Sequence, residues 1–145
     1  MPQYLSDAQG PFGRNRDATS KIRAALRQEG CHTPVVCTGG VHNFEYAEAM
    51  LAAGECDVVG TARQSLADPD WALKTLLGRA DAVRLCEYTN YCEGLDQKHK
   101  QVTCQLWDRE DLDEPGIRMS HDGKRRLVAP AWRDAPALLD AHARQ

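Results

Sequence analysis

The fold is decided by two short stretches of sequence, residues 34–40 (PVVCTGG) and residues 57–63 (DVVGTAR). Each is a short apolar run with β-branched residues that ends in small residues, which is typical of a buried strand followed by a tight turn. The segment between them, residues 43–53, has its apolar residues at helical spacing. This order of strand, helix and strand, with short connections, predicts two parallel strands joined by a crossover helix. Because neither strand alternates apolar and polar residues, both faces of the sheet are expected to be covered.

A helix is predicted before the first strand, from its capping residue Asp17 to about Gln28. Its apolar residues are Ile22, Ala25 and Leu26, and a glycine follows its last turn. In the crossover helix, Asn43 is the predicted cap, and Ala47, Met50 and Leu51 are predicted to face inward. These elements together predict the α/β class of fold.

Beyond the second strand, residues 68–70 (DPD) form a helix-start signal, and Gly78 is the predicted end of that helix. A shorter helical piece is predicted at residues 80–84 and a terminal helix at residues 135–144. Residues 86–134 carry cysteines, charges and scattered glycines without periodicity, which predicts an irregular segment.

Length, charge and cysteine usage exclude several classes of protein. The chain has 145 residues, which suits one ordinary domain, and its net charge of -3 gives no broad attraction to nucleic acids or membranes. No apolar run approaches the roughly 20 residues that a membrane span needs, and the N-terminus lacks the apolar core of a secretory signal. Six cysteines in such a chain indicate reduced thiols in the cytoplasm. We therefore expect a cytoplasmic protein without a nucleic-acid or membrane partner.

The carboxyl ends of the two strands form a candidate anion site, because ligands of parallel α/β folds bind at such ends. Gly39 and Gly40 follow the first strand, and Thr61, Ala62 and Arg63 follow the second. Small residues allow backbone N–H groups to approach an anion, and the guanidinium of Arg63 supplies a planar, permanent charge suited to phosphate. The alternative is that the glycines only form tight turns and that Arg63 is a surface charge.

Residues 34–41, 57–63 and 66–71 (LADPDW) resemble the last quarter of the Old Yellow Enzyme family. Its members are FMN-dependent NAD(P)H:flavin oxidoreductases, and their relatives include 2,4-dienoyl-CoA reductase and trimethylamine dehydrogenase. The resemblance, which covers about residues 17–108, implies that the two strands are the seventh and eighth of a (β/α)8 TIM barrel. It implies that residues 1–85 are barrel units and residues 86–145 an irregular, cysteine-containing extension.

The resemblance also implies the cofactor FMN. Its phosphate would be held by Gly39, Gly40, Ala62 and Arg63, and its flavin would lie near Thr38 and Thr61. Hydride would pass from NAD(P)H through the flavin to a small electron-poor acceptor in the parent enzyme.

A complete barrel needs about 250 residues, and the family's catalytic residues lie on earlier strands. No catalytic residue is assigned to this chain. We expect a truncated gene, a fragment or one piece of a split enzyme, inactive alone, whose partner is the missing N-terminal barrel portion or another copy of itself. The uncovered flanks of the two strands predict poor solubility or association.

In the dienoyl-CoA reductase branch, four cysteines after the eighth strand bind a [4Fe–4S] cluster. This chain retains Cys86, Cys92 and Cys104, and it has Thr89 where the family has its second cysteine. Three interpretations stay open: a vestigial loop of reduced cysteines, a cluster on three thiolates, and a zinc site that adds His99. The alternative function is therefore a non-catalytic metal- or iron–sulfur-binding fragment.

Overall fold

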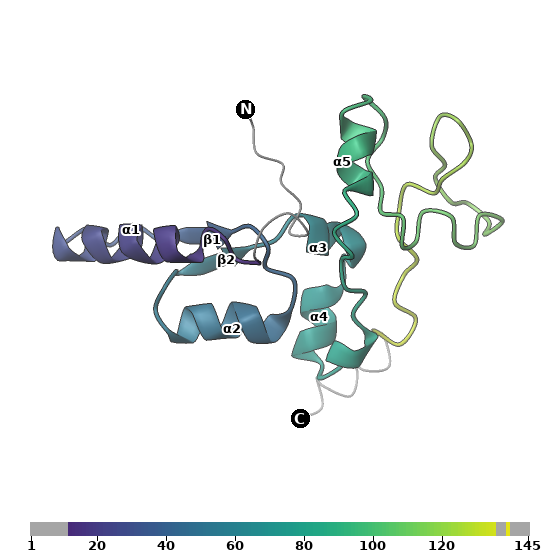
Figure 1. Ribbon diagram of the computed structural model, residues 1–145. Coiled ribbons are helices and arrows are strands. Elements are labelled where there is room, and N and C mark those ends of the chain that lie inside the picture. The colour runs from purple at the N-terminus through teal and green to yellow at the C-terminus, as the bar shows by residue number, and fades with distance from the viewer. Residues whose placement is uncertain (1–11, 136–138, 140–145) are drawn as a thin grey trace. The chain divides into compact units, whose positions relative to one another are not determined.

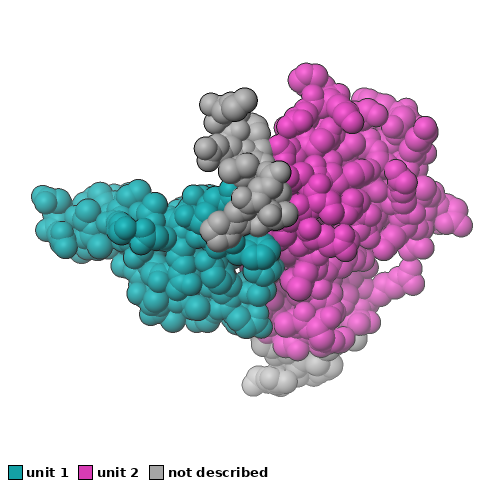
Figure 2. All heavy atoms as spheres, viewed as in Figure 1, with its two compact units in different colours: residues 1–62 teal, residues 63–145 magenta. Residues whose placement is uncertain are grey.

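The structure is a computed structural model that describes residues 12–135 and Leu139 (Figure 1). The predicted terminal helix at residues 135–144 and most of the predicted N-terminal loop lie outside these residues. The chain divides into two compact units, residues 1–62 and residues 63–145 (Figure 2). The predicted division at residue 85 separates barrel units from the extension, and it stays a prediction.

The first unit is built around a two-stranded parallel sheet. Its elements are α1 (Arg16–Gln28), β1 (Val36–Thr38), α2 (Phe44–Ala52) and β2 (Val58–Gly60). Val36 pairs with Val58 and Thr38 pairs with Gly60, so the two strands end at the same level. The predicted α/β class and the parallel pair joined by a helix are confirmed, whereas the eight-stranded barrel stays a prediction.

The core of this unit lies on one face of the sheet, beneath α2. It consists of Cys37, Val41, Ala47, Met50 and Cys56. The predicted inward positions Ala47 and Met50 are confirmed, but Leu51 is exposed. The opposite face carries Val36 and Val58, whose exposed fractions are 54% and 47%. The expectation that both faces are covered is therefore wrong for the described part of the chain.

The inward side of α1 is basic rather than apolar. Arg23 and Arg27 both bind the carboxylate of Asp57, with N–O distances of 2.9 and 2.8 Å. Arg16 pairs with Glu55 in the same way, its Nη2 lying 2.9 Å from Oε1. Two of the three predicted apolar positions, Ile22 and Ala25, are exposed, so ion pairs attach this helix where the pattern predicted an apolar stripe.

Helix ends follow the sequence signals closely. The side chain of Asn43 accepts a hydrogen bond of 2.8 Å from Tyr46 N–H, as expected of the cap of α2. Gly30 and Gly54 lie just beyond α1 and α2 with φ of 73° and 66°, a left-handed conformation that favours glycine. The prediction of Asp17 as the cap of α1 is wrong by two residues, because Asn15 occupies that position.

The second unit contains short helices: α3 (Arg63–Ala67), α4 (Trp71–Leu76), the 3-10 helix η2 (Ala80–Ala82) and α5 (Tyr91–Asp96). The predicted helix after residues 68–70 is α4, and Gly78 ends it with a φ of 69°. The sequence did not predict α3 or α5. From residue 97 to residue 134 the chain forms turns and one isolated antiparallel bridge, Met119 to Arg126, in agreement with the predicted irregular segment.

A buried ion pair organises the start of this unit. Asp68 Oδ2 accepts hydrogen bonds of 2.6 Å from Lys74 Nζ and 2.8 Å from Arg84 N–H. The amide of Gln64 continues the network, donating 2.9 Å to the Arg84 carbonyl and accepting 2.9 Å from Cys86 N–H. These hydrogen bonds hold the segment from Arg84 to Cys86 next to Gln64 of α3 and next to Asp68. Among the described helices, none is long and apolar enough to cross a bilayer.

Candidate functional site

The loop after β1 has a backbone that only glycine adopts easily. Gly39 and Gly40 have φ of 111° and 72°. A Cβ atom on Gly39 would lie 2.7 Å from Nδ2 of Asn15, which donates a hydrogen bond of 2.9 Å to the Thr38 carbonyl. The turn therefore needs both glycines for its own geometry, and their role toward an anion stays a prediction.

His42 lies directly beyond this loop and contacts the loop itself. Its Nδ1 is 3.3 Å from the Gly40 carbonyl, and its ring stacks on Phe12 with the centroids 4.2 Å apart. These contacts fix the entry to α2.

The ends of β1 and β2 bring most of the predicted anion site to one edge of the sheet. Because Thr38 pairs with Gly60, residues 39–40 and residues 61–62 leave the sheet side by side. Thr38 and Ala62 are exposed at this edge, and Thr61 is half-buried. Gly39 is half-buried and Gly40 is buried, and binding of a ligand at this edge stays a prediction.

Arg63 follows as the first residue of α3, and it has contacts that the sequence did not predict. Its Nη1 donates a hydrogen bond of 2.9 Å to Asn90 Oδ1, and its guanidinium carbon lies 4.6 Å from the centroid of the Tyr88 ring. Tyr88 and Asn90 both have positive φ, 53° and 60°. Asparagine adopts a positive φ more readily than most residues, but a tyrosine rarely does. The sequence therefore did not indicate this backbone conformation at Tyr88. The arginine is therefore held in place by the cysteine-containing segment.

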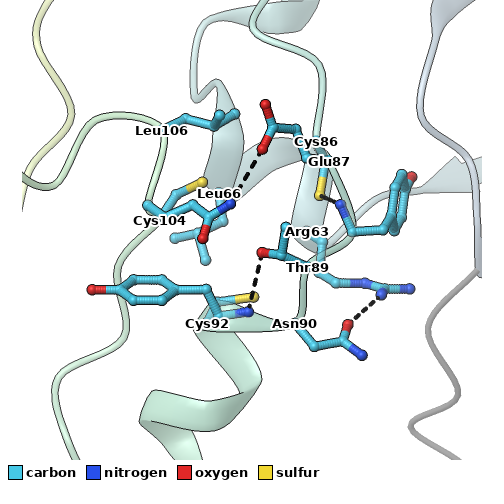
Figure 3. A pocket seen from close by; sticks show the side chains of 12 residues that line it. Arg63, Leu66, Cys86, Glu87, Thr89, Asn90, Cys92, Cys104 and Leu106 are labelled. Carbon is cyan, nitrogen blue, oxygen red and sulfur yellow. Dashed lines mark hydrogen bonds between the residues drawn. The ribbon is translucent and has the colours of Figure 1, made fainter. Parts of the chain in front are cut away.

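The three cysteines of that segment line one hollow, which we call the cysteine hollow (Figure 3). Cys86 precedes α5, Cys92 lies in its first turn, and Cys104 follows it. Thr89 and the apolar side chains of Leu66 and Leu106 are also in the wall. The sequence prediction named these cysteines as one site, and the structure places them around one hollow.

The thiols of the cysteine hollow influence one another. Burial raises the pKa of the Cys104 thiol above its usual range, and the neighbouring thiols of Cys86 and Cys92 raise it further. The backbone N–H of Tyr88 donates a 3.4 Å hydrogen bond to the sulfur of Cys86. The Oγ1 atom of Thr89 accepts a hydrogen bond of 3.4 Å from Tyr91 N–H.

Tyr91, which lines the hollow, is anchored by the buried carboxylate of Asp108. The Oδ2 atom of Asp108 accepts hydrogen bonds of 2.8 Å from the Tyr91 hydroxyl and 2.7 Å from the Thr103 hydroxyl. Burial, and secondly the bond to Asp108, raise the pKa of Tyr91. Trp107 donates from its indole to the Leu66 carbonyl at 2.9 Å. These bonds hold the chain on both sides of Cys104 in a defined position.

Within the part of the chain that the structure describes, no group of three or more His, Cys, Asp or Glu side chains is arranged to hold a metal ion. His99 is not part of the wall of the cysteine hollow. The zinc interpretation, which requires His99 and three thiolates to converge on one ion, is therefore not supported.

No protein-family model matches the chain. It is 36% identical over 102 residues to a bilirubin reductase of Mediterraneibacter gnavus, a match that covers 70% of this chain and 16% of that protein. It is 38% identical over 53 residues to an NADH oxidase of Thermoanaerobacter brockii, covering 37% of the chain and 8% of that protein. The chain is 30% identical over 98 residues to an N,N-dimethylglycine/sarcosine dehydrogenase of Chromohalobacter salexigens. This match covers 66% of the chain and 14% of that protein.

All three relatives are oxidoreductases by name, so the chain is a partial homologue of oxidoreductases, which agrees with the family resemblance. The chain spans 16% or less of the length of these relatives.

Proposed function

We propose that this chain is the FMN-binding segment of an NAD(P)H-dependent flavin oxidoreductase of the Old Yellow Enzyme type. In this proposal β1 and β2 are the last two strands of a (β/α)8 barrel, whose loops at that position commonly bind a phosphate. The observation that carries the proposal is the common edge at which residues 39–40 and residues 61–62 leave the sheet.

The residues at this edge fit a phosphate. Gly39 and Gly40 present backbone without side chains, and Ala62 adds only a methyl group. Their N–H groups would bind phosphate oxygens, and the guanidinium of Arg63 would balance the negative charge. Thr38 and Thr61 would lie beside the flavin. The flavin, when bound, supplies the redox chemistry, and the protein positions it.

The activity of the whole enzyme follows from this proposal. NAD(P)H would reduce the flavin, and a small electron-poor acceptor would reoxidise it, in the cytoplasm. This chain contributes cofactor-binding residues and no catalytic residue. The rest of the barrel would come from the missing N-terminal portion or a second copy of the chain. We expect no turnover of NADH or NADPH with a quinone or enone by the chain alone.

The test is a fluorescence titration of FMN with the full chain, alone and together with the missing barrel portion. Arg63→Ala should raise the dissociation constant about 10- to 100-fold, because a hydrogen bond to a charged group contributes roughly 1.5–3 kcal/mol. Arg133→Ala is the matched control, since the Arg133 side chain is 88% exposed. Its FMN affinity should equal that of the native chain.

Circular dichroism of Arg63→Ala separates lost binding from lost folding, because Arg63 also contacts Asn90 and Tyr88. A folded Arg63→Ala chain with native FMN affinity would contradict the proposal.

The second candidate function is a metal- or iron–sulfur-binding fragment without catalysis, centred on residues 86–104. It is favoured by the single hollow that Cys86, Cys92 and Cys104 share. Purification without oxygen, followed by iron and acid-labile sulfide analysis, tests it. A colourless chain without metal would leave the vestigial loop as the explanation.

A further inference from the structure

We propose that a second hollow of the second unit binds a small organic cation with N–H groups, a primary ammonium or a guanidinium, through the buried carboxylate of Asp108. This hollow, which we call the Asp108 pocket, has a volume of about 310 Å³. Its wall consists of Glu87, Tyr91, Gln105, Leu106, Asp108 and Arg109. The proposal goes beyond both candidate functions and depends on neither FMN nor a metal.

The Asp108 pocket adjoins the cysteine hollow but differs from it in chemistry. The two share four wall residues, of which Glu87 and Leu106 are labelled in Figure 3. None of the described cysteines lines the Asp108 pocket, whereas three charged side chains do. Its wall residues all belong to the second unit.

The observation that carries the proposal is a buried oxygen atom without a hydrogen-bond donor. Asp108 is 1% exposed, and its Oδ2 accepts hydrogen bonds from the hydroxyls of Tyr91 and Thr103. Its Oδ1 is also buried, and among the described residues it has no hydrogen-bond partner. A buried carboxylate oxygen is seldom left in this state, because nothing replaces the water that it loses. A ligand with an N–H group would supply the donor.

The carboxylate is fixed before any ligand binds. The backbone N–H of Asp108 donates a 2.9 Å hydrogen bond to the Cys104 carbonyl, and the Asp108 carbonyl accepts one of 2.8 Å from Arg126 N–H. The two hydroxyl donors hold the side chain at Oδ2. Binding at Oδ1 therefore requires little further ordering of the protein.

The charges of the wall favour a cation. Glu87 and Asp108 are acidic, and Arg109 is the basic residue of the wall. Arg125 is buried nearby, but its Nη1 donates to the Thr103 hydroxyl at 3.1 Å rather than to Asp108. Charge-assisted hydrogen bonds are about twice as strong as neutral ones, so an ammonium or guanidinium suits Oδ1 better than an amide or alcohol.

The wall is graded from a buried acid to an exposed rim. Tyr91 and Leu106 are half-buried, whereas Glu87, Gln105 and Arg109 are exposed. The Tyr91 ring and Leu106 would contact a short apolar tail, and an aromatic ring also attracts a cation. Glu87 Oε2 accepts a 3.2 Å hydrogen bond from Gln105 Nε2, which positions the second carboxylate at the rim.

The experiment is an NMR titration of the full, nitrogen-15-labelled chain with n-butylammonium chloride at constant ionic strength. We expect saturable shifts of the backbone amide signals of Glu87, Tyr91 and residues 105–109. Tetramethylammonium has the same charge without an N–H group, and n-butanol has the same tail without a charge. Both should bind at least about 10-fold more weakly, because a hydrogen bond to a charged group contributes at least that factor.

The first variant is Asp108→Asn, with circular dichroism as the check on folding. The amide oxygen can still accept from Tyr91 and Thr103, while the amide nitrogen places a donor where Oδ1 lies. It should weaken n-butylammonium binding at least about 10-fold.

Two variants at the exposed rim test the charge of the pocket without changing a buried residue. Glu87→Gln should weaken binding about 2- to 5-fold, and Arg109→Gln should strengthen it by a similar factor. A variant that only loosened the fold would not gain affinity. The matched controls are Asp113→Asn and Arg118→Gln, which change exposed residues outside the wall and should keep the native affinity.

Three results would overturn the proposal: no saturable shifts in the native chain, equal affinity for n-butylammonium and tetramethylammonium, or native affinity in a folded Asp108→Asn chain. If Asp108→Asn does not fold, native affinity in both Glu87→Gln and Arg109→Gln refutes the proposal instead. FMN titration and metal analysis are independent of these results, so the candidate functions stand or fall separately.

Discussion

Gly39, a residue of the predicted anion site, has a backbone conformation that is strained for a side chain. Its φ of 111° is strained for any residue with a side chain, and a Cβ atom would meet Asn15 Nδ2 at 2.7 Å. We expect Gly39→Ala to destabilise the first unit by at least about 1–2 kcal/mol, because both the backbone and Asn15 must shift. Urea unfolding followed by circular dichroism measures this.

Gly94 provides the comparison for that substitution. It lies within α5, its φ is not positive, and a Cβ atom there would meet nothing within 4 Å. Gly94→Ala should therefore be neutral or stabilising by up to about 1 kcal/mol. Equal effects of the two substitutions would show that the Gly39 turn is not constrained as described.

Helix α1 is attached to the sheet by charge, which makes the first unit sensitive to acid. Hydrogen bonds from Arg23 and from Val35 N–H lower the pKa of Asp57 from its ordinary 3.8 to about 2. A carboxylate with a lowered pKa stabilises the folded state above its ordinary pKa, and this contribution is lost as the pH falls toward 2. Thermal unfolding should show the stability declining between about pH 4 and pH 2.

Asp57→Asn should lower the stability at pH 7 and flatten this decline, since an amide carries no charge to lose. Asp17→Asn is the control, because Asp17 pairs with Lys21 on the surface, where the two side chains are 79% and 75% exposed. An Asp57→Asn chain whose acid profile matches that of the native protein would contradict the assignment.

The Asp68–Lys74 pair joins the residue that follows α3 to α4, and the two side chains are only 1% and 4% exposed. Lys74→Met removes one partner and leaves a buried carboxylate, which costs about 3–5 kcal/mol. Lys21→Met removes an exposed lysine from a surface pair and should cost less than about 1 kcal/mol. Chemical denaturation of both variants gives the difference, and similar values would show that the pair is not buried in solution.

The sequence predicted elements wherever the local chemistry alone determines them. Asn43 and the glycines beyond the helices act through their own backbone, so the ends of α2 and α4 were predictable. The face of α1 was not, because its inward arginines depend on Asp57, a residue distant in the sequence. α3 and α5 are too short to show a period. In the candidate site, the residue types were predictable, but the contacts of Arg63 with Asn90 and Tyr88 were not, since they depend on tertiary structure.

At the scale of the whole molecule, one face of the two-stranded sheet stays largely exposed to solvent. Val36 and Val58 are paired neighbours on this face, and each is about half exposed. In the described residues neither outer edge of the pair carries a further strand. Exposed apolar surface next to unpaired strand edges favours association between chains. In the proposed barrel, the remaining strands would cover both the exposed apolar face and the unpaired strand edges.

We therefore expect the chain alone to form oligomers, and the double variant Val36→Thr/Val58→Thr to shift it toward the monomer in sedimentation velocity. Threonine keeps the β-branching that suits a strand while its hydroxyl binds water. Leu76→Gln is the control, because Leu76 is 68% exposed and belongs to α4 of the second unit, not to the sheet. If this surface is the one that the rest of the barrel covers, the double variant should also bind the missing barrel portion more weakly than the native chain does. A double variant that associates like the native chain would exclude this face as the site of association.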